Sequence, residues 1–358
     1  MSQDDISTRK RDHLRAFQPG RRPPTGPEGS WLDCVRLVHQ ALPEMDLDAL
    51  DLSATFFGHQ LDSPLMICAM TGGTEEGAEI NRALARCAER IGAAFGLGSL
   101  RPALEDPACI DTYAVRRAAP GVPLVGNLGG AQLARVDIDA LRALLERLEA
   151  DVMCVHLNTA QELVQPGGDR RFAGTLDGIA RLVERLGFPV MVKECGCGLS
   201  RETAARLQNA GVGWVDVAGA GGTCFVATEL QRSGDSTDRQ SPLVGWGIPT
   251  AASVAEMGGL DLKVIASGGV RHGLDAARAI ALGADLVGLA APLLQAWYSG
   301  GEAGVERALA PLVEELAQVM LLCGCGDLAA LRRAPRVITG PLADWIRSRG
   351  LTDAADRS

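Results

Sequence analysis

Short, almost continuous apolar runs alternate along most of the chain with segments whose apolar residues recur at helical spacing. Amphipathic stretches such as INRALARCAERIG and GIARLVERLG separate most of these runs, with a glycine at or near the end. Apolar strands that alternate with helices predict a parallel sheet covered on both faces. The strand candidates are residues 64–70, 93–99, 123–129, 152–158, 189–194, 214–219, 263–269 and 286–291.

The number of strand–helix units predicts the architecture within this α/β class. Eight units fit a closed (β/α)8 barrel, the TIM-barrel fold, which typically needs ~250 residues. An open, doubly wound sheet is the alternative, and the strand number and the positions of the polar residues disfavour it. We expect residues 64–358 to form the barrel with a C-terminal helical extension, and residues 1–63 to form an N-terminal extension.

Two segments outside the regular units have patterns of their own. Residues 9–15 gather Arg and Lys, and the Pro-, Gly- and Arg-rich residues 17–30 predict a mobile link between this basic tip and the barrel. The Gly-, Ser- and Thr-rich residues 220–248 predict a lid or a subunit contact.

Composition and charge exclude several classes of protein. The chain has 358 residues, and its net charge of −9 (35 basic against 44 acidic) argues against a nucleic-acid-binding surface. The apolar runs are too short to span a bilayer, and the N-terminus is too charged for a signal peptide. The ten cysteines lie scattered, which favours reduced thiols in a cytoplasmic protein over a disulfide framework. Two Cys-x-Cys pairs lack zinc-finger spacing, so small core residues are favoured over metal ligands there.

Nearly every strand candidate ends in small or polar residues. In a parallel barrel the carboxyl ends of all strands lie on one face, and this face carries the active site. We therefore expect a site where these ends converge. The residues concerned are Met70, Thr71, Gly72, Gly73, Gly98, Ser99, Asn127, His156, Asn158, Lys193, Glu194, Asp216, Ser267, Gly268 and Gly269.

Residues 265–294 combine a strand, a glycine turn, a helix, a strand and an apolar start of another helix. The corresponding loops of many barrels bind a phosphate at a helix N-terminus. Gly268 and Gly269 allow close backbone approach, so flavin mononucleotide is one interpretation and a tight structural turn is the other. DVAGAGGT at 216–223 lacks full G-x-G-x-x-G spacing and a clear helix after it, which argues against a dinucleotide fingerprint.

Further chemistry is expected at two other strand ends. Lys193 is either ion-paired or placed to stabilise negative charge on a ligand such as reduced flavin. His156 and Asn158 are two residues apart, so on a strand they would point to the same side. Gln161 and Glu162 follow on the predicted loop, where Glu162 could bind Mg²⁺ that substrate phosphates help to coordinate. A polar strand end that caps a helix is the alternative for these four residues.

Motifs along almost the whole chain, residues 9–350, occur in the order expected of one enzyme family. The chain resembles the type 2, flavin-dependent isopentenyl-diphosphate isomerases. The resemblance implies a (β/α)8 barrel that holds FMN. It also implies a 1,3-allylic proton shift between isopentenyl and dimethylallyl diphosphate, which requires Mg²⁺ and needs the FMN to be reduced by NADPH. The motifs are RKRDH (9–13), RLVHQALPE (36–44), AMTGG (69–73), GLGS followed by Arg101, NLGG (127–130), HLNTAQE (156–162), VKECGCGLS (192–200), DVAGAGGT (216–223), GWGIPTA (245–251) and SGGVRHGLDAARAIALGAD (267–285).

The resemblance also implies roles for individual residues. Gln161, His156 and Lys193 would be catalytic, with reduced flavin as the proton carrier, and Glu162 would bind Mg²⁺. The basic N-terminal tip would be an arm that closes over the diphosphate, and the assembly would be a homotetramer or larger. FMN would be held by Ala69, Met70, Thr71, Ser99, Asn127, Lys193, Thr223, Gly268, Gly269, Val270, Arg271, Ala290 and Ala291. The substrate would be held by Arg9, Lys10, His13, Ser99, Arg101, His156, Asn158 and Gln161.

The sequence departs from the family at a few positions, and other functions remain open. Leu100 stands where the family usually has Gln, and Cys195, Cys197 and Cys224 are unusual within their motifs. Another FMN-dependent TIM-barrel oxidoreductase, a 2-hydroxy-acid or inosinate-type dehydrogenase, is the main rival. Against it, the only late histidine is His272, which we expect to face solvent. A non-catalytic flavin-binding homologue is a further alternative.

Overall fold

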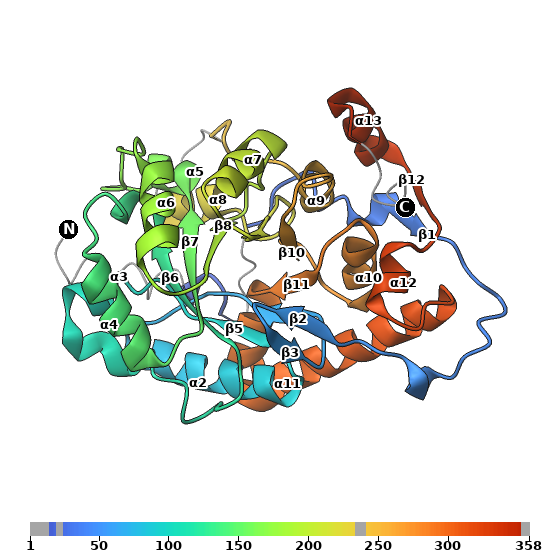
Figure 1. Ribbon diagram of the computed structural model, residues 1–358, viewed down its shortest axis with the longest axis horizontal. Helices are drawn as coiled ribbons and strands as arrows, with labels where there is room; N and C mark the ends of the chain where they lie inside the picture. Colours follow the sequence, from blue (N-terminus) through green and yellow to red (C-terminus); the bar gives the residue numbers. More distant parts are fainter. Residues whose placement is uncertain (1–13, 19–23, 233–240, 352–358) are drawn as a thin grey trace.

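A closed barrel of eight parallel strands forms the centre of the protein in a computed structural model that describes residues 14–18, 24–232 and 241–351 (Figure 1). The sheet closes because β4 pairs with both β5 and β11. All eight strands fall within the predicted apolar runs, so the barrel is confirmed and the open sheet is wrong. The strands are β4 (Leu65–Ile67), β5 (Ala94–Gly96), β6 (Leu124–Gly129), β7 (Val152–Leu157), β8 (Val190–Glu194), β9 (Trp214–Asp216), β10 (Lys263–Ser267) and β11 (Leu286–Leu289).

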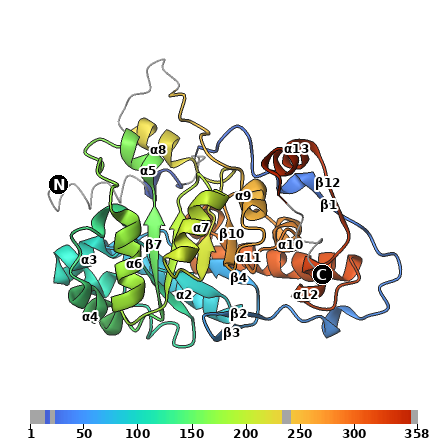
Figure 2. The same cartoon turned by 45° about the horizontal axis from the view of Figure 1, so that its top comes forward.

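Amphipathic helices lie around the barrel (Figures 1 and 2). In α4, for example, Asp137 caps the first turn, and Leu141, Leu144, Leu145 and Leu148 form one buried stripe. Burial of such stripes against the strands stabilises the outer layer. The helices between the strands are α2 (Glu75–Arg90), α3 (Arg101–Glu105), α4 (Ile138–Leu148), α5 (Thr159–Val164), α6 (Thr175–Arg185), α7 (Arg201–Asn209), α8 (Phe225–Arg232), α9 (Thr250–Glu256) and α10 (Gly273–Ala281).

The amino-terminal end of the barrel is filled by apolar side chains. The hairpin of β2 (Ala54–Phe56) and β3 (His59–Leu61) lies there. Phe56 and Leu61 pack with the inward-facing residues at the starts of the strands, and the Phe56 ring lies 5.1 Å from that of Trp214 in edge-on geometry. Access to the interior is therefore left to the carboxyl-terminal end.

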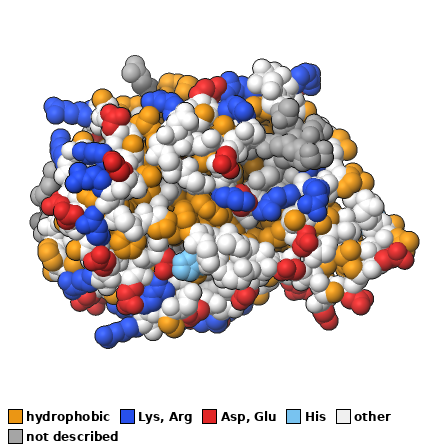
Figure 3. All heavy atoms as spheres, viewed as in Figure 1, with side chains coloured by type: hydrophobic (Ala, Val, Ile, Leu, Met, Phe, Trp, Pro, Cys, Tyr) orange, Lys and Arg blue, Asp and Glu red, His pale blue; other side chains and the backbone are white. Residues whose placement is uncertain are grey.

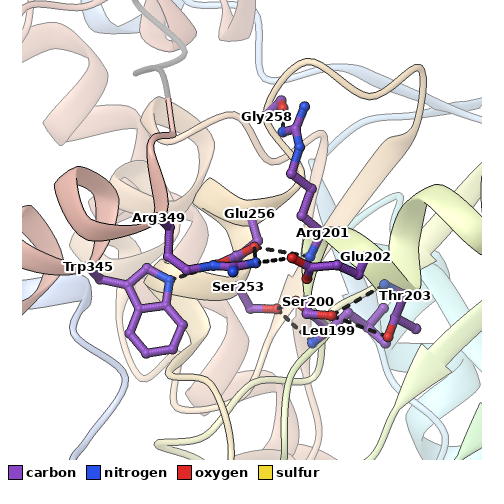
Figure 4. A network of polar contacts seen from close by, with 10 residues as sticks. All are labelled: Leu199, Ser200, Arg201, Glu202, Thr203, Ser253, Glu256, Gly258, Trp345 and Arg349. Carbon is purple, nitrogen blue, oxygen red and sulfur yellow. Dashed lines mark hydrogen bonds and ion pairs between the residues drawn. The ribbon is translucent and has the colours of Figure 1, made fainter.

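The predicted C-terminal helical extension is present. It consists of α11 (Ala291–Leu322), α12 (Leu328–Arg332) and α13 (Gly340–Arg349). Before α13, β12 (Arg336–Ile338) pairs with β1 (Val35–Leu37). This pairing joins the segment before the barrel to the C-terminal extension. The network in Figure 4 fastens α13 to the barrel: Glu256 is fully buried and accepts hydrogen bonds from Arg349 Nε at 2.8 Å and Trp345 Nε1 at 2.8 Å.

The link predicted for residues 17–30 is not a free chain where the structure describes it. Phe17 is buried, and the Pro24 carbonyl accepts a hydrogen bond from Cys224 N at 2.7 Å. Thr25 forms a bridge with Thr223, and the Ser30 carbonyl accepts from Ala251 N at 2.9 Å. The prediction of a mobile link is thus wrong for these residues, because apolar burial and backbone hydrogen bonds hold them on the carboxyl-terminal face. Residues 19–23 lie outside the described part.

The cysteines, the helix lengths and the surface charges bear on the expectations from composition. The ten cysteines are all free, and five of them are buried. No helix among the described residues is long and apolar enough to cross a membrane. Basic and acidic side chains lie interspersed on the face shown in Figure 3, so the excess of negative charge is not gathered in one patch there.

Candidate active site

The inward-facing side chains change from apolar to polar along five of the eight strands, β6 to β10. An apolar inward residue is followed two positions later by a polar one, because alternate residues of a strand face the same side. The polar residues therefore form a layer at the carboxyl-terminal end of the barrel. The pairs are Val125 and Asn127, Cys154 and His156, Met191 and Lys193, Trp214 and Asp216, and Ile265 and Ser267.

Lys193 lies at the centre of this polar layer. It is in register with His156 on β7 and with Asp216 on β9, and His156 Nδ1 lies 3.0 Å from Asn127 Oδ1. The ends of β6, β7 and β8 thus bring Asn127, His156 and Lys193 to one region. This convergence is what the prediction of a site at the strand ends requires.

Burial and charge act on the Lys193 ammonium in opposite directions. Its Nζ donates to the Glu194 carbonyl at 2.9 Å and lies 3.3 Å from Cys195 Sγ. Burial alone would lower the pKa of Lys193, but the neighbouring Cys195 and Asp216 outweigh it and raise this pKa above its usual value. Lys193 is therefore a cation at neutral pH inside a largely apolar barrel.

Asp216 is a buried acidic neighbour of this cation, in register with it on β9. Its side chain accepts a hydrogen bond from Ser267 Oγ at 2.6 Å and one from Ala218 N at 3.1 Å. Burial raises the pKa of Asp216, while Lys193 and the hydrogen bond from Ser267 lower it. Asp216 and Ser267 were noted at strand ends but given no role from the sequence, because only the closed sheet brings them beside Lys193.

A cavity of about 260 Å³ opens above the polar layer. It is lined by every residue implied for FMN except Ser99 and Asn127. Cys195, Asp216, Ser267, Leu14 and Phe17 complete parts of its wall. The FMN set found there comprises Ala69, Met70, Thr71, Lys193, Thr223, Gly268, Gly269, Val270, Arg271, Ala290 and Ala291.

Glycine allows two loops of the cavity to pack backbone against backbone. Gly268 has φ +102°, and a Cβ there would lie 2.2 Å from the Gly219 carbonyl oxygen. A Cβ on Gly222 would lie 2.9 Å from Gly269 N. Side chains at these positions would push the loops apart, so the sequence GG at 268–269 is a steric requirement of the cavity.

The cavity suits a flavin phosphate and ring. Thr71 Oγ1 is buried at the wall and has no hydrogen-bond partner among the described residues, so it is free to bond to a ligand. Ala290 is the N-cap and Ala291 the first residue of α11, and both line the cavity, so backbone N–H groups at this helix start favour an anion. Lys193 supplies a positive charge at the cavity floor.

Ser99 and Asn127 do not line this cavity. Asn127 is buried and bonded to His156. The Ser99 carbonyl accepts a hydrogen bond from Tyr113 Oη at 2.7 Å. Leu100, the departure from the family pattern, is fully buried in the outer core and contributes nothing to the cavity wall.

Those residues implied for the substrate that the structure describes lie over β5 to β7, on the other side of the mouth. Gln161 and Glu162 belong to α5, so the loop predicted for them is wrong. β7 ends at Leu157, and Asn158 has turned away from strand geometry, with φ −138° and ψ 38°. The expectation that His156 and Asn158 share one side of a strand is therefore also wrong, although both line a second hollow beside the mouth.

Glu162 is buried and held by two hydrogen bonds. Its side chain accepts from Asn158 Nδ2 at 3.0 Å and from Asp169 N at 2.7 Å. The described residues contain no group of three His, Cys, Asp or Glu that could hold a metal. One oriented carboxylate fits Mg²⁺ that is coordinated largely by water and substrate phosphates.

Gln161 contacts a residue that the sequence did not reveal. Its Nε2 donates to Glu229 Oε1 at 2.9 Å, and Glu229 also accepts from Arg232 Nε at 2.8 Å. Glu229 is fully buried on α8, a helix that does follow DVAGAGGT. The prediction that no clear helix follows this motif is therefore wrong. The incomplete glycine spacing is the one remaining argument against a dinucleotide fingerprint. No local motif marks Glu229, because its contact is with a residue far away in sequence.

The remaining residues implied for the substrate are distributed between the rim and the N-terminal tip. Arg101 begins α3, and its Nε donates to Glu105 Oε1 at 2.8 Å. Arg9, Lys10 and His13 lie outside the described residues. The next residue, Leu14, lines the cavity, so the chain that follows the tip reaches the mouth.

Comparison with known proteins gives consistent results. Residues 137–338 match the family described as FMN-dependent dehydrogenase. The chain is 45% identical to an isopentenyl-diphosphate delta-isomerase of Symbiobacterium thermophilum over 96% of this chain and 95% of the relative. It is 46% identical to an isopentenyl-diphosphate delta-isomerase of Xanthobacter autotrophicus over 94% of this chain and 98% of the relative.

Solved structures show the same fold. Mandelate oxidase with 2-hydroxy-phenylacetamide superposes with a TM-score of 0.64 over 95% of this chain and 99% of the oxidase chain. The sequence identity is 22%, so this likeness concerns the barrel architecture and not the substrate.

Proposed function

The chain belongs to the isopentenyl-diphosphate delta-isomerase family, in its flavin-dependent type 2 branch, and we propose that it interconverts isopentenyl and dimethylallyl diphosphate. The observation that carries the proposal is 45% identity over almost the full length of both chains. The cavity, lined by nearly all residues implied for FMN, supports it independently.

The reaction moves a proton between the two ends of an allylic system. An acid protonates the terminal alkene carbon, a base removes a proton from the carbon nearer the oxygen, and no net oxidation occurs. When bound, reduced FMN supplies a proton-carrying nitrogen and an anionic ring that stabilises developing positive charge. NADPH is the proposed reductant of the flavin.

Lys193 is proposed to hold the reduced flavin in its anionic form. The cation lies at the cavity floor, and Asp216 keeps it charged. Asp216 is held by Ser267, and Lys193 Nζ by the Glu194 carbonyl, so both side chains are positioned before the cofactor binds.

Gln161 is proposed to orient or relay the transferred proton. The bond from its Nε2 to Glu229 fixes which side of the amide carries the donor. Its Oε1 lies 3.4 Å from Asn158 Nδ2, so both ends of the amide are oriented. His156, anchored by Asn127, is proposed to face the substrate from the neighbouring strand.

The diphosphate is proposed to bind on the β5–β7 side. Arg101, His156 and Asn158 would contact it there, and Glu162 would bind its Mg²⁺. We propose that residues 1–63 form an extension whose basic tip, with Arg9, Lys10 and His13, closes over this group, and that residues 64–358 form the barrel unit. A homotetramer or larger assembly is the proposed oligomeric state.

One assay separates this function from its rivals. Purified protein is incubated without oxygen with FMN, NADPH, Mg²⁺ and isopentenyl diphosphate in D₂O, and the product is followed by NMR. Deuterium in dimethylallyl diphosphate supports the isomerase. Flavin reduction by a 2-hydroxy acid would instead support a dehydrogenase, and bound FMN without either reaction would support a non-catalytic flavoprotein.

A further inference from the structure

A buried cluster behind the cavity wall joins the two sides of the mouth. We call it the Tyr113 cluster. It lies where the 3₁₀ helix Pro107–Thr112 meets the loops after β4 and β5. Its members are Thr71, Gly72, Gly73, Asn81, Ser99, Thr112 and Tyr113.

Tyr113 contacts both loops with different parts of its side chain. The residue is fully buried, and its hydroxyl donates to the Ser99 carbonyl at 2.7 Å. Its ring lies against Gly72, where a Cβ would be 2.1 Å from ring atom Cε1. Burial raises the pKa of Tyr113 far above its usual value, so the hydroxyl stays protonated and remains a donor.

Thr112 and Asn81 hold the loop after β4 in the same cluster. Gly73 N donates to Thr112 Oγ1 at 2.8 Å. Asn81 Nδ2 donates to the Thr71 carbonyl and to the Thr112 carbonyl, both at 3.3 Å. The backbone adds one link between the loops, from Gly98 N to the Thr71 carbonyl at 3.0 Å.

Each loop carries residues of one half of the mouth. The loop after β4 places Met70 and Thr71 in the flavin cavity. The loop after β5 carries Ser99 and leads to Arg101, which is proposed to bind the diphosphate. Tyr113, Thr112 and Asn81 do not line the cavity themselves, so they act on the ligands only through these loops.

We propose that Tyr113 and Thr112 are positioning residues that set the substrate side and the flavin side of the mouth separately. The Tyr113 hydroxyl fixes Ser99 and thereby Arg101, whereas the Thr112 hydroxyl fixes Gly73 and thereby Thr71. The assignment of ligands rests on the proposed function. A small displacement of a binding group is enough to change affinity strongly, which is why buried polar links of this kind matter.

The chain supplies a matched control, because it has two tyrosines. Tyr298 Oη donates to Glu76 Oε1 at 2.8 Å, between α11 and α2 and away from the cavity. Tyr298→Phe therefore removes one tyrosine hydrogen bond of similar length without touching either loop. Tyr113→Phe and Thr112→Val are the test variants.

The experiment measures KM and kcat for isopentenyl diphosphate, the Kd of FMN by flavin fluorescence, and Tm for all three variants. Tyr113→Phe should raise KM about tenfold and leave the FMN Kd within about twofold, as expected for one lost buried hydrogen bond. Thr112→Val should raise the FMN Kd about tenfold and leave KM within about twofold. Tyr298→Phe should change neither KM nor the FMN Kd.

Two outcomes would overturn the proposal. One is a loss of Tm without any split between KM and FMN Kd, since a merely structural role would affect both sides alike. The other is a larger effect of Tyr113→Phe than of Thr112→Val on FMN. If the wild-type protein binds FMN but does not convert isopentenyl diphosphate, the proposed function fails, while the FMN titrations still decide the role of Thr112 and Tyr113.

Discussion

The two halves of the barrel mouth are built in different ways. The flavin side, over β4 and β8 to β11, is shaped by glycine loops packed backbone to backbone and by Lys193 and Asp216, which lie in register on neighbouring strands. The substrate side, over β5 to β7, consists of longer side chains that hydrogen-bond to one another, as Asn158 does with Glu162. The flavin side is thus ready for its ligand, whereas side chains on the substrate side must exchange partners when one binds.

This difference has an energetic reason. Backbone loops and buried, hydrogen-bonded side chains such as Lys193 lose little freedom on binding, and the free Thr71 hydroxyl has no partner among the described residues to give up. Arg101 already bonds to Glu105, and Glu162 already accepts two hydrogen bonds. Under the proposed function, selectivity for the substrate therefore depends on contacts that form only when the diphosphate binds.

The largest effect is expected from a methyl group on the flavin side. Gly268→Ala would place a Cβ 2.2 Å from the Gly219 carbonyl at φ +102°, so the two loops must separate. We expect FMN affinity to fall by roughly 1000-fold, measured by fluorescence titration. Gly58→Ala is the control, because Gly58 also has positive φ, +85°, but open space around it. If Gly268→Ala binds FMN normally, the flavin side is not rigid.

Removal of the buried cation should reduce catalysis next most strongly. Lys193→Met leaves Asp216 without its cation, and we expect kcat to fall by about 100- to 1000-fold. The flavin reduction potential should also become more negative, because the anionic reduced form loses a positive neighbour. Lys263→Met, at an exposed lysine paired with Asp285, is the control. An unchanged potential would argue against the proposed role of Lys193.

A substitution on the substrate side should lower turnover and leave the affinity for FMN unchanged. Gln161→Ala should lower kcat by roughly 100-fold and leave the FMN Kd nearly unchanged, since Gln161 does not line the flavin cavity. Steady-state kinetics and FMN titration check this. Glu229→Gln should give a smaller loss, because the amide of Gln161 loses only its charged acceptor. Equal losses of turnover and FMN affinity would show that the two halves are not independent.

The smallest effect concerns pH and the loop that follows β8. Glu194 accepts hydrogen bonds from Cys195 N and Cys197 N, and burial raises its pKa from 4.5 to about 7. The unfolded chain loses this proton first, so the free energy of unfolding should fall as pH rises from 4.5 to about 7 and then level off. Denaturant titrations of wild type and Glu194→Gln should diverge over that interval. Parallel curves would contradict the shift.

Much of the fold was predictable from local patterns. Strand positions follow from continuous apolar runs, and helices follow from apolar residues at helical spacing, since each run must be buried whichever partners it finds. The glycine positions of the flavin side could also be anticipated, because positive φ and close backbone approach demand glycine at residues 268 and 269. The prediction of a mobile link at 17–30 was wrong, because nothing local shows that Phe17 finds a buried site.

By itself, then, the sequence determined the eight strands, their order and the face on which their polar ends meet. Only the tertiary structure decided which residues far apart in the chain meet: Lys193 in register with Asp216, the bond from Gln161 to Glu229, and the contact of Tyr113 with Ser99. The physical reason is the distance along the chain between the residues that interact. Periodicity records what each segment must bury, whereas a hydrogen bond between residues far apart in the chain depends on closure of the barrel, which no local pattern contains.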